Sequence, residues 1–109
     1  MRAKLVGALG LVCALLTVPA LAEESVVQVT LKDHKFTPAE VEAPAGKPLT
    51  VEVSNQDSTA AEFESKDLRV EKVTPAGGKA TVRVRALKPG RYRFYDDYNA
   101  SAVGYLVVK

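Results

Sequence analysis

The sequence of 109 residues is poor in the side chains that bind soft metals, with one cysteine, one methionine and one histidine. Cys13 and Met1 both lie in the N-terminal segment, so the rest of the chain has no sulfur. A disulfide and a C-x-x-C redox motif are therefore excluded for that part, which its hydrophobic core alone must stabilise.

A catalytic constellation is also missing. The hydroxyl side chains have no partner base beyond His34, no glycine-rich phosphate loop opens a helix, and H-E-x-x-H does not occur. We therefore expect that the protein is not an enzyme.

The N-terminal segment has the three parts of a secretory signal peptide. Residues 1–4 are basic, residues 5–18 are apolar, and Ala20-Leu21-Ala22 is a small-residue cleavage site. The apolar run is shorter than the roughly 20 residues that a membrane-spanning helix needs. We predict a signal peptide over residues 1–22, export to the periplasm, and one domain over residues 23–109 that does not insert into the membrane.

The net charge gives no reason to expect a polyanionic partner. The chain has 15 Lys and Arg against 13 Asp and Glu, and Arg2 and Lys4 of the predicted signal peptide account for the excess. The remaining domain is formally neutral, so we expect no nucleic-acid partner. Four arginines occur at positions 83, 85, 91 and 93. We expect the two pairs on strands of different sheets, so they should not form a single patch.

From residue 27 onward, apolar and polar residues alternate as they do in half-buried strands. The clearest runs cover residues 27–32, 49–54, 80–85, 91–95 and 105–108, and Leu68, Val70 and Val73 are expected core contacts. Turns rich in Pro, Gly, Asn and Asp separate the runs, and no stretch has a convincing helical period. About seven strands with frequent turns predict an all-β Greek-key sandwich.

One motif supports this fold directly. Leu87-Lys88-Pro89-Gly90-Arg91-Tyr92 has the form L-x-P-G-x-Y, which resembles the tyrosine corner of Greek-key sandwiches. We therefore predict that the Tyr92 hydroxyl donates a hydrogen bond to upstream backbone.

Taken together, these residues resemble the cupredoxin-like family, and specifically its small periplasmic EfeO-type domains. The resemblance rests on V-T-L-K-D-H-K-F-T-P (29–38), A-G-K (45–47), V-S-N (53–55), E-F-E (62–64) and residues 87–108. It implies a cupredoxin-like fold, a bound copper or iron ion, and an association with iron uptake. The implied partner is an Ftr-type iron permease or another periplasmic or inner-membrane uptake component.

The departures from the family pattern decide which metal chemistry we expect. The resemblance implies that the blue-copper ligand positions hold Ala61 or Glu62, Asp96, Asn99 and Ala102. A type 1 copper centre needs a thiolate, two imidazoles and usually a thioether, so we expect none here. The EfeO-type pattern has two cysteines and one glutamate. The resemblance implies that Phe36 and Asp96 stand at the two cysteine positions and that the glutamate is retained as Glu62.

We therefore predict an oxygen-rich metal site built from Glu62, Asp96 and Asp97, with His34 as a further ligand. Carboxylates of this kind suit Fe(III), Mn(II) or weakly held Cu(II) and Zn(II). Glu64 is a further candidate for this site, but we assign it to an ordinary solvated acidic face.

Two alternatives remain open. In one, the domain is a metal-free β-sandwich module that binds a membrane transporter through the surface around Tyr95 and Tyr98. In the other, it is a small redox-assisting domain that binds copper transiently without a thiolate.

Overall fold

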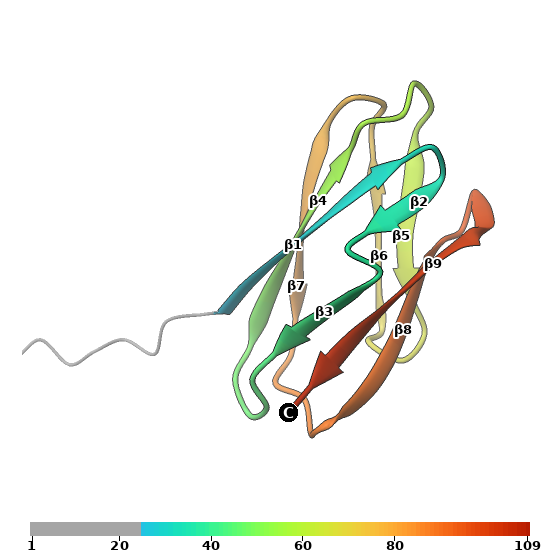
Figure 1. Cartoon of the computed structure of the whole chain (residues 1–109). Helices are drawn as coiled ribbons and strands as arrows, with labels where there is room; N and C mark the ends of the chain where they lie inside the picture. Colours follow the sequence, from blue (N-terminus) through green and yellow to red (C-terminus); the bar gives the residue numbers. More distant parts are fainter. Residues whose placement is uncertain (1–24) are drawn as a thin grey trace, which may run out of the picture.

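A computed structural model describes residues 25–109 of the protein, and the predicted signal peptide lies outside these residues. Two sheets face each other across one core (Figure 1). The nine strands of the described part are β1 (Ser25–Lys32), β2 (Lys35–Thr37), β3 (Glu40–Ala43), β4 (Leu49–Asn55), β5 (Ala61–Ser65), β6 (Val70–Thr74), β7 (Lys79–Val84), β8 (Gly90–Asp96) and β9 (Asn99–Val108).

The strand order confirms the predicted all-β sandwich. One sheet has the order β2-β1-β4-β7 and the other the order β3-β9-β8-β5-β6. The pairs β1–β4 and β3–β9 are parallel, and the other pairs are antiparallel. Within residues 25–109 no helix has the length and apolar character that crossing a membrane requires.

The inward-facing residues of both sheets form a single core. Three aromatic rings lie at its centre: Phe63 stacks on Phe94 with centroids 4.9 Å apart, and Phe36 meets Phe94 edge-on at 5.0 Å. Phe94 in turn packs directly on the backbone of Gly104, its partner in β9. This tight packing fixes the position of β8 against β9 and β5.

The structure has more strands than the seven or so predicted, because two short strands, β2 and β3, lie between residues 35 and 43. Asp33 and His34 adopt positive φ angles of 52° and 58°, which turn the chain back so that β2 pairs with the end of β1. The prediction that Val73 is a core residue is wrong, because the residue is 47% exposed. It lies on the outer face of the edge strand β6, while Thr74 of the same strand faces inward.

The tyrosine corner is confirmed. The Tyr92 hydroxyl donates a hydrogen bond to the Lys88 carbonyl at 2.7 Å. Tyr92→Phe removes this bond alone, so we expect the free energy of unfolding to fall by about 1 kcal/mol, measured by urea denaturation. Tyr105→Phe is the control, because a phenylalanine keeps the contact of that ring with the Arg91 guanidinium. Equal stability of Tyr92→Phe and wild type would show that the corner contributes nothing.

Candidate metal centre

Three carboxylates converge on the outer face of the five-stranded sheet. Glu62 and Glu64 point outward from β5, because Phe63 between them faces the core. Asp97 follows the end of β8, the neighbouring strand. One carboxylate oxygen from each of the three residues lies within 4.8 Å of the other two. We call Glu62, Glu64 and Asp97 the carboxylate triad.

Negative charge accumulates at the triad. Burial raises the pKa of the Glu62 carboxyl, and the charges of Glu71, Glu64 and Asp97 raise this pKa further. The Tyr95 hydroxyl donates a hydrogen bond to Oε2 of Glu64 at 3.1 Å. Burial, followed by that hydrogen bond, raises the pKa of the Tyr95 phenol, so it remains a donor at neutral pH. A bound cation would offset the repulsion among the carboxylates.

Asp96 lies beside the triad but faces the interior. It pairs with the core residue Phe63 and is 2% exposed. Its Oδ1 atom accepts hydrogen bonds from the backbone N–H groups of Glu62 and Tyr98, each at 2.9 Å. The carboxylate of Asp96 is thus directed at the backbone and is not part of the triad.

His34 belongs to a different cluster, at the turn between β1 and β2. The Asp57 carboxylate accepts hydrogen bonds from the backbone N–H groups of Asp33 (2.6 Å) and His34 (3.0 Å). The imidazole Nδ1 of His34 lies 3.7 Å from Oδ2 of Asp57. Asp57 also accepts a hydrogen bond from Gly77 N–H through its own carbonyl. This residue therefore joins three loops at one end of the sandwich.

We call the two hydrogen bonds that the Asp57 carboxylate accepts from the N–H groups of Asp33 and His34 the Asp57 clamp. Its contribution to stability should fall in acid. The N–H group of His34 is the main cause that holds the pKa of Asp57 below its ordinary value. The stabilisation is therefore present above the unfolded pKa of about 3.9, and it is lost as pH falls through the lowered folded pKa. We expect the unfolding temperature of wild type to exceed that of Asp57→Ala at neutral pH, with the gap closing in acid. Asp33→Asn, which changes a side chain in the same turn, is the control. Its unfolding temperature should exceed that of Asp57→Ala by as much as the wild-type value does.

The structure thus places two of the four predicted ligands, Glu62 and Asp97, in one cluster. Asp96 lies directly behind them, and His34 lies with Asp57. The sequence analysis set Glu64 aside as part of a solvated acidic face, whereas the structure places it in the cluster. The signal was available, because residues two apart on a strand share a face, and Glu62 and Glu64 flank the apolar Phe63.

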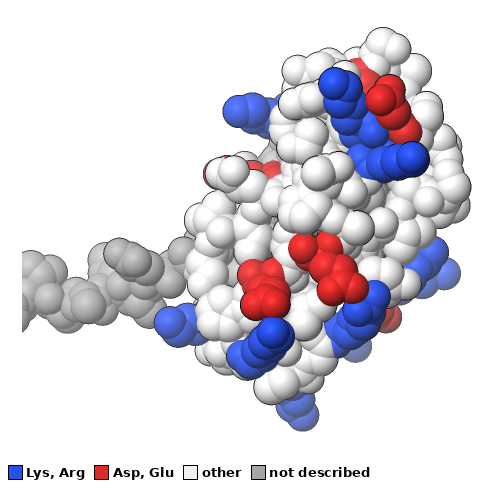
Figure 2. All heavy atoms as spheres, in the orientation of Figure 1, with Lys and Arg blue, Asp and Glu red and all other residues white. Residues whose placement is uncertain are grey.

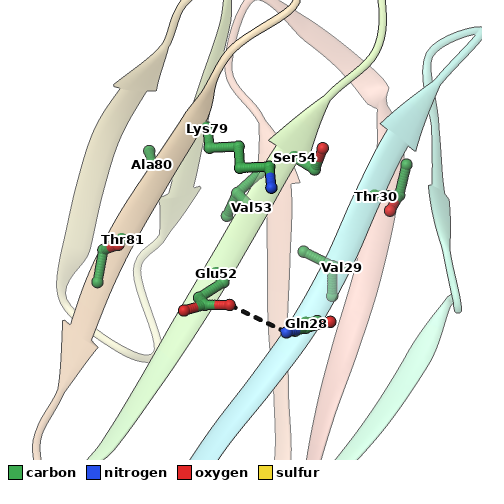
Figure 3. A pocket seen from close by; sticks show the side chains of 9 residues that line it. All are labelled: Gln28, Val29, Thr30, Glu52, Val53, Ser54, Lys79, Ala80 and Thr81. Carbon is green, nitrogen blue, oxygen red and sulfur yellow. Dashed lines mark hydrogen bonds between the residues drawn. The ribbon is translucent and has the colours of Figure 1, made fainter.

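The rest of the described surface offers no comparable set of ligands. A hollow of about 350 Å³ lies on the outer face of β1, β4 and β7. Figure 3 shows the side chains that line it. The only charged groups among its lining residues are Glu52, which accepts a hydrogen bond from Gln28, and Lys79. In Figure 2 basic and acidic side chains alternate over the visible face. As predicted, Arg83 and Arg91 belong to strands of different sheets.

Comparison with known proteins agrees with this architecture. A curated relative, the uncharacterized protein RP394 of Rickettsia prowazekii, is 37% identical over 83 residues, which are 75% of this chain and 66% of that protein. The chain therefore spans just under two thirds of the length of this relative.

Two solved structures share the fold at low sequence identity. A purple cupredoxin from Nitrosopumilus maritimus is 18% identical, with a TM-score of 0.58 over 76% of this chain and 99% of that one. The metal-binding domain of the Cu(I)-exporting P-type ATPase CopA of Streptococcus pneumoniae D39, solved with Cu(I), is 14% identical. Its TM-score is 0.67 over 83% of this chain and 92% of that domain. The family model of the cupredoxin-like domain matches residues 5–108, and the chain therefore belongs to the cupredoxin-like domain family.

Proposed function

We propose that this protein is an exported cupredoxin-like accessory that binds a metal ion through the carboxylate triad. The observation that carries the proposal is the convergence of three carboxylate oxygens within 4.8 Å on one face of the sheet. Oxygen ligands of this kind favour hard cations, so Fe(III) and Mn(II) are better candidates than Cu(I). Cu(II) and Zn(II) are weaker candidates for the same site.

The donor set does not fit the copper centre that the family suggests. Residues 25–109 contain no cysteine and no methionine. Asp96 accepts two backbone hydrogen bonds, and His34, the one imidazole of the chain, lies with Asp57. A type 1 site needs a thiolate and two imidazoles. These residues support a protein that is not a type 1 electron carrier.

A role beside iron uptake follows from the resemblance to EfeO-type domains. On this proposal the protein works in the periplasm and meets an Ftr-type iron permease or a similar uptake component. Its own contribution is to hold the ion in an oxygen site until the partner takes it. The position of the triad, with Glu62 and Glu64 half-buried and Asp97 exposed, supports such a transfer because the ion would remain accessible.

Metal titration tests the proposal. The exported chain is titrated calorimetrically with Fe(III) citrate, Mn(II), Cu(II) and Zn(II), and at least one ion should bind at one per chain. The double variant Glu64→Gln, Asp97→Asn should lower the affinity at least about tenfold, since it removes two ligands. Glu52→Gln, on the outer face of the other sheet, should bind as wild type does. Absence of binding for every ion would overturn the proposal.

A metal-free interaction module remains the second candidate. Tyr98 in the β8–β9 loop is 58% exposed and is one of three large hydrophobic residues exposed in residues 25–109, with Val26 and Val73. If no metal binds, and a detergent-solubilised uptake permease retains wild type but not Tyr98→Ser, this second function is supported.

A further inference from the structure

A buried carboxylate, that of Asp96, lies directly behind the triad. Asp96 ends β8 and is 2% exposed, whereas Glu62 and Glu64 are half-buried and Asp97 is exposed. Its Oδ1 atom lies 2.9 Å from each of two backbone nitrogens, those of Glu62 and Tyr98. One oxygen therefore ties β5 to the loop that connects β8 with β9, the loop at the right of Figure 1.

These contacts lock two triad residues together through their backbones. The N–H group of Glu62 donates to Asp96, and the carbonyl of Glu62 accepts from the N–H group of Asp97 at 2.8 Å. The N–H group and the carbonyl of Glu62 are thus both hydrogen-bonded to the segment Asp96–Asp97, which carries the triad residue Asp97. The pairing of β8 with β9 also shifts register between Tyr95 and Asp96, so the regular ladder is interrupted at this point. The side chain of Asp96 thus accepts a hydrogen bond from β5 at the point where the regular backbone pairing of β8 is interrupted.

We propose that Asp96 is the positioning residue of the site: it holds Glu62 and Asp97 at the separation that the ion needs, without ligating the ion. This inference rests on the proposed metal-binding function. Two observations favour positioning over ligation. Asp96 pairs with Phe63 and is buried on the core side of the sheet, while the triad lies on the outer side. Its Oδ1 atom already accepts two hydrogen bonds, so only Oδ2 could ligate an ion without disturbing them.

The proposal predicts that an acceptor oxygen at position 96 matters more than the charge. Asp96→Asn keeps a carbonyl oxygen for the two N–H groups, and we expect its metal affinity to stay within about threefold of wild type. Asp96→Ala leaves both N–H groups without that acceptor. Groups that orient metal ligands typically contribute about 10- to 100-fold to affinity, so we expect a loss of that size. If Asp96 were a ligand, the two variants would lose affinity alike.

The experiment compares both variants with a matched control of a purely structural kind. Ser65 lies on β5 with Glu62 and is also buried, and its Oγ donates to the Arg93 carbonyl and accepts from Leu68 N–H. Ser65→Ala should lower the unfolding temperature and leave the affinity for the ion identified by titration unchanged. Rescue by Asp96→Asn together with normal affinity in Ser65→Ala supports positioning. Equal loss in Asp96→Asn and Asp96→Ala would overturn it.

Amide hydrogen exchange of metal-free wild type gives an answer that depends on no variant. The N–H groups of Glu62 and Tyr98 should be protected, although Tyr98 lies in an exposed loop. Exchange of the Tyr98 amide at the rate of an unstructured peptide would contradict the proposal even if metal binds. Conversely, protection of both amides in a protein that binds no ion would leave Asp96 as a loop anchor. In that case the metal-binding function fails, and the positioning role fails with it.

Discussion

Gly104→Ala is expected to lower the free energy of unfolding by about 3 kcal/mol, at the upper end of the range for overpacked cores. A Cβ atom at this position would lie 2.4 Å from two carbons of the Phe94 ring and 3.2 Å from the carbonyl oxygen of Ala39. Phe94 cannot move aside, because it is 1% exposed and packs against the rings of Phe36 and Phe63. Urea denaturation followed by circular dichroism measures the change.

Gly90→Ala is the matched control, because a Cβ there would meet the Tyr92 ring at an ordinary 3.4 Å. We expect it to change stability by less than about 1 kcal/mol. The smaller side chain of Phe94→Leu should reduce the cost of Gly104→Ala, which a double-mutant cycle detects. If Gly104→Ala were as stable as Gly90→Ala, the Phe94 ring could not lie as close to Gly104 as the structure places it.

The fold was predictable from the sequence because most strands are long enough to display their alternation. β7, with the burial pattern exposed–buried repeated three times, is one such strand. β2 has only three residues and one apolar side chain, Phe36, so it carries no period of its own. Its pairing depends on the left-handed backbone of Asp33 and His34, a conformation that these residue types tolerate but do not require. A turn of that kind is set by the Asp57 clamp, which lies 23 residues away.

The site was predictable in part, for a related reason. The outward direction of Glu62 follows from the alternation along β5. The inward direction of Asp96 also follows from alternation, because Phe94 faces the core and Tyr95 faces Glu64 on the outer side. Its hydrogen-bond partners could not be predicted in this way. Whether a carboxylate at such a position turns toward solvent or toward backbone N–H groups depends on strands that pair across the sheet. That information is absent from the local pattern.

Glu62→Gln is expected to weaken metal binding and to stabilise the metal-free protein. Glutamine lacks the charged carboxylate that an ion requires, so the affinity should fall at least about tenfold. Because the pKa of Glu62 is raised on folding, the folded protein binds the proton more tightly than the unfolded chain does. Stability therefore falls as pH rises from the unfolded pKa of about 4.3 through the raised folded pKa, and it stays lower above that window. Glutamine does not ionise, so the variant does not lose stability in this way as pH rises.

Thermal unfolding from pH 4 to pH 8, with and without the ion, measures both effects. The metal-free variant should have the higher unfolding temperature at neutral pH, and the difference should vanish toward the acid end of the range, where Glu62 becomes protonated in both states. Glu71→Gln is the control: it removes a charge that raises the pKa of Glu62, but Glu71 is not in the triad. It should stabilise the metal-free protein and keep the affinity. A Glu62→Gln variant that binds the ion as wild type does would remove Glu62 from the site, whatever its stability.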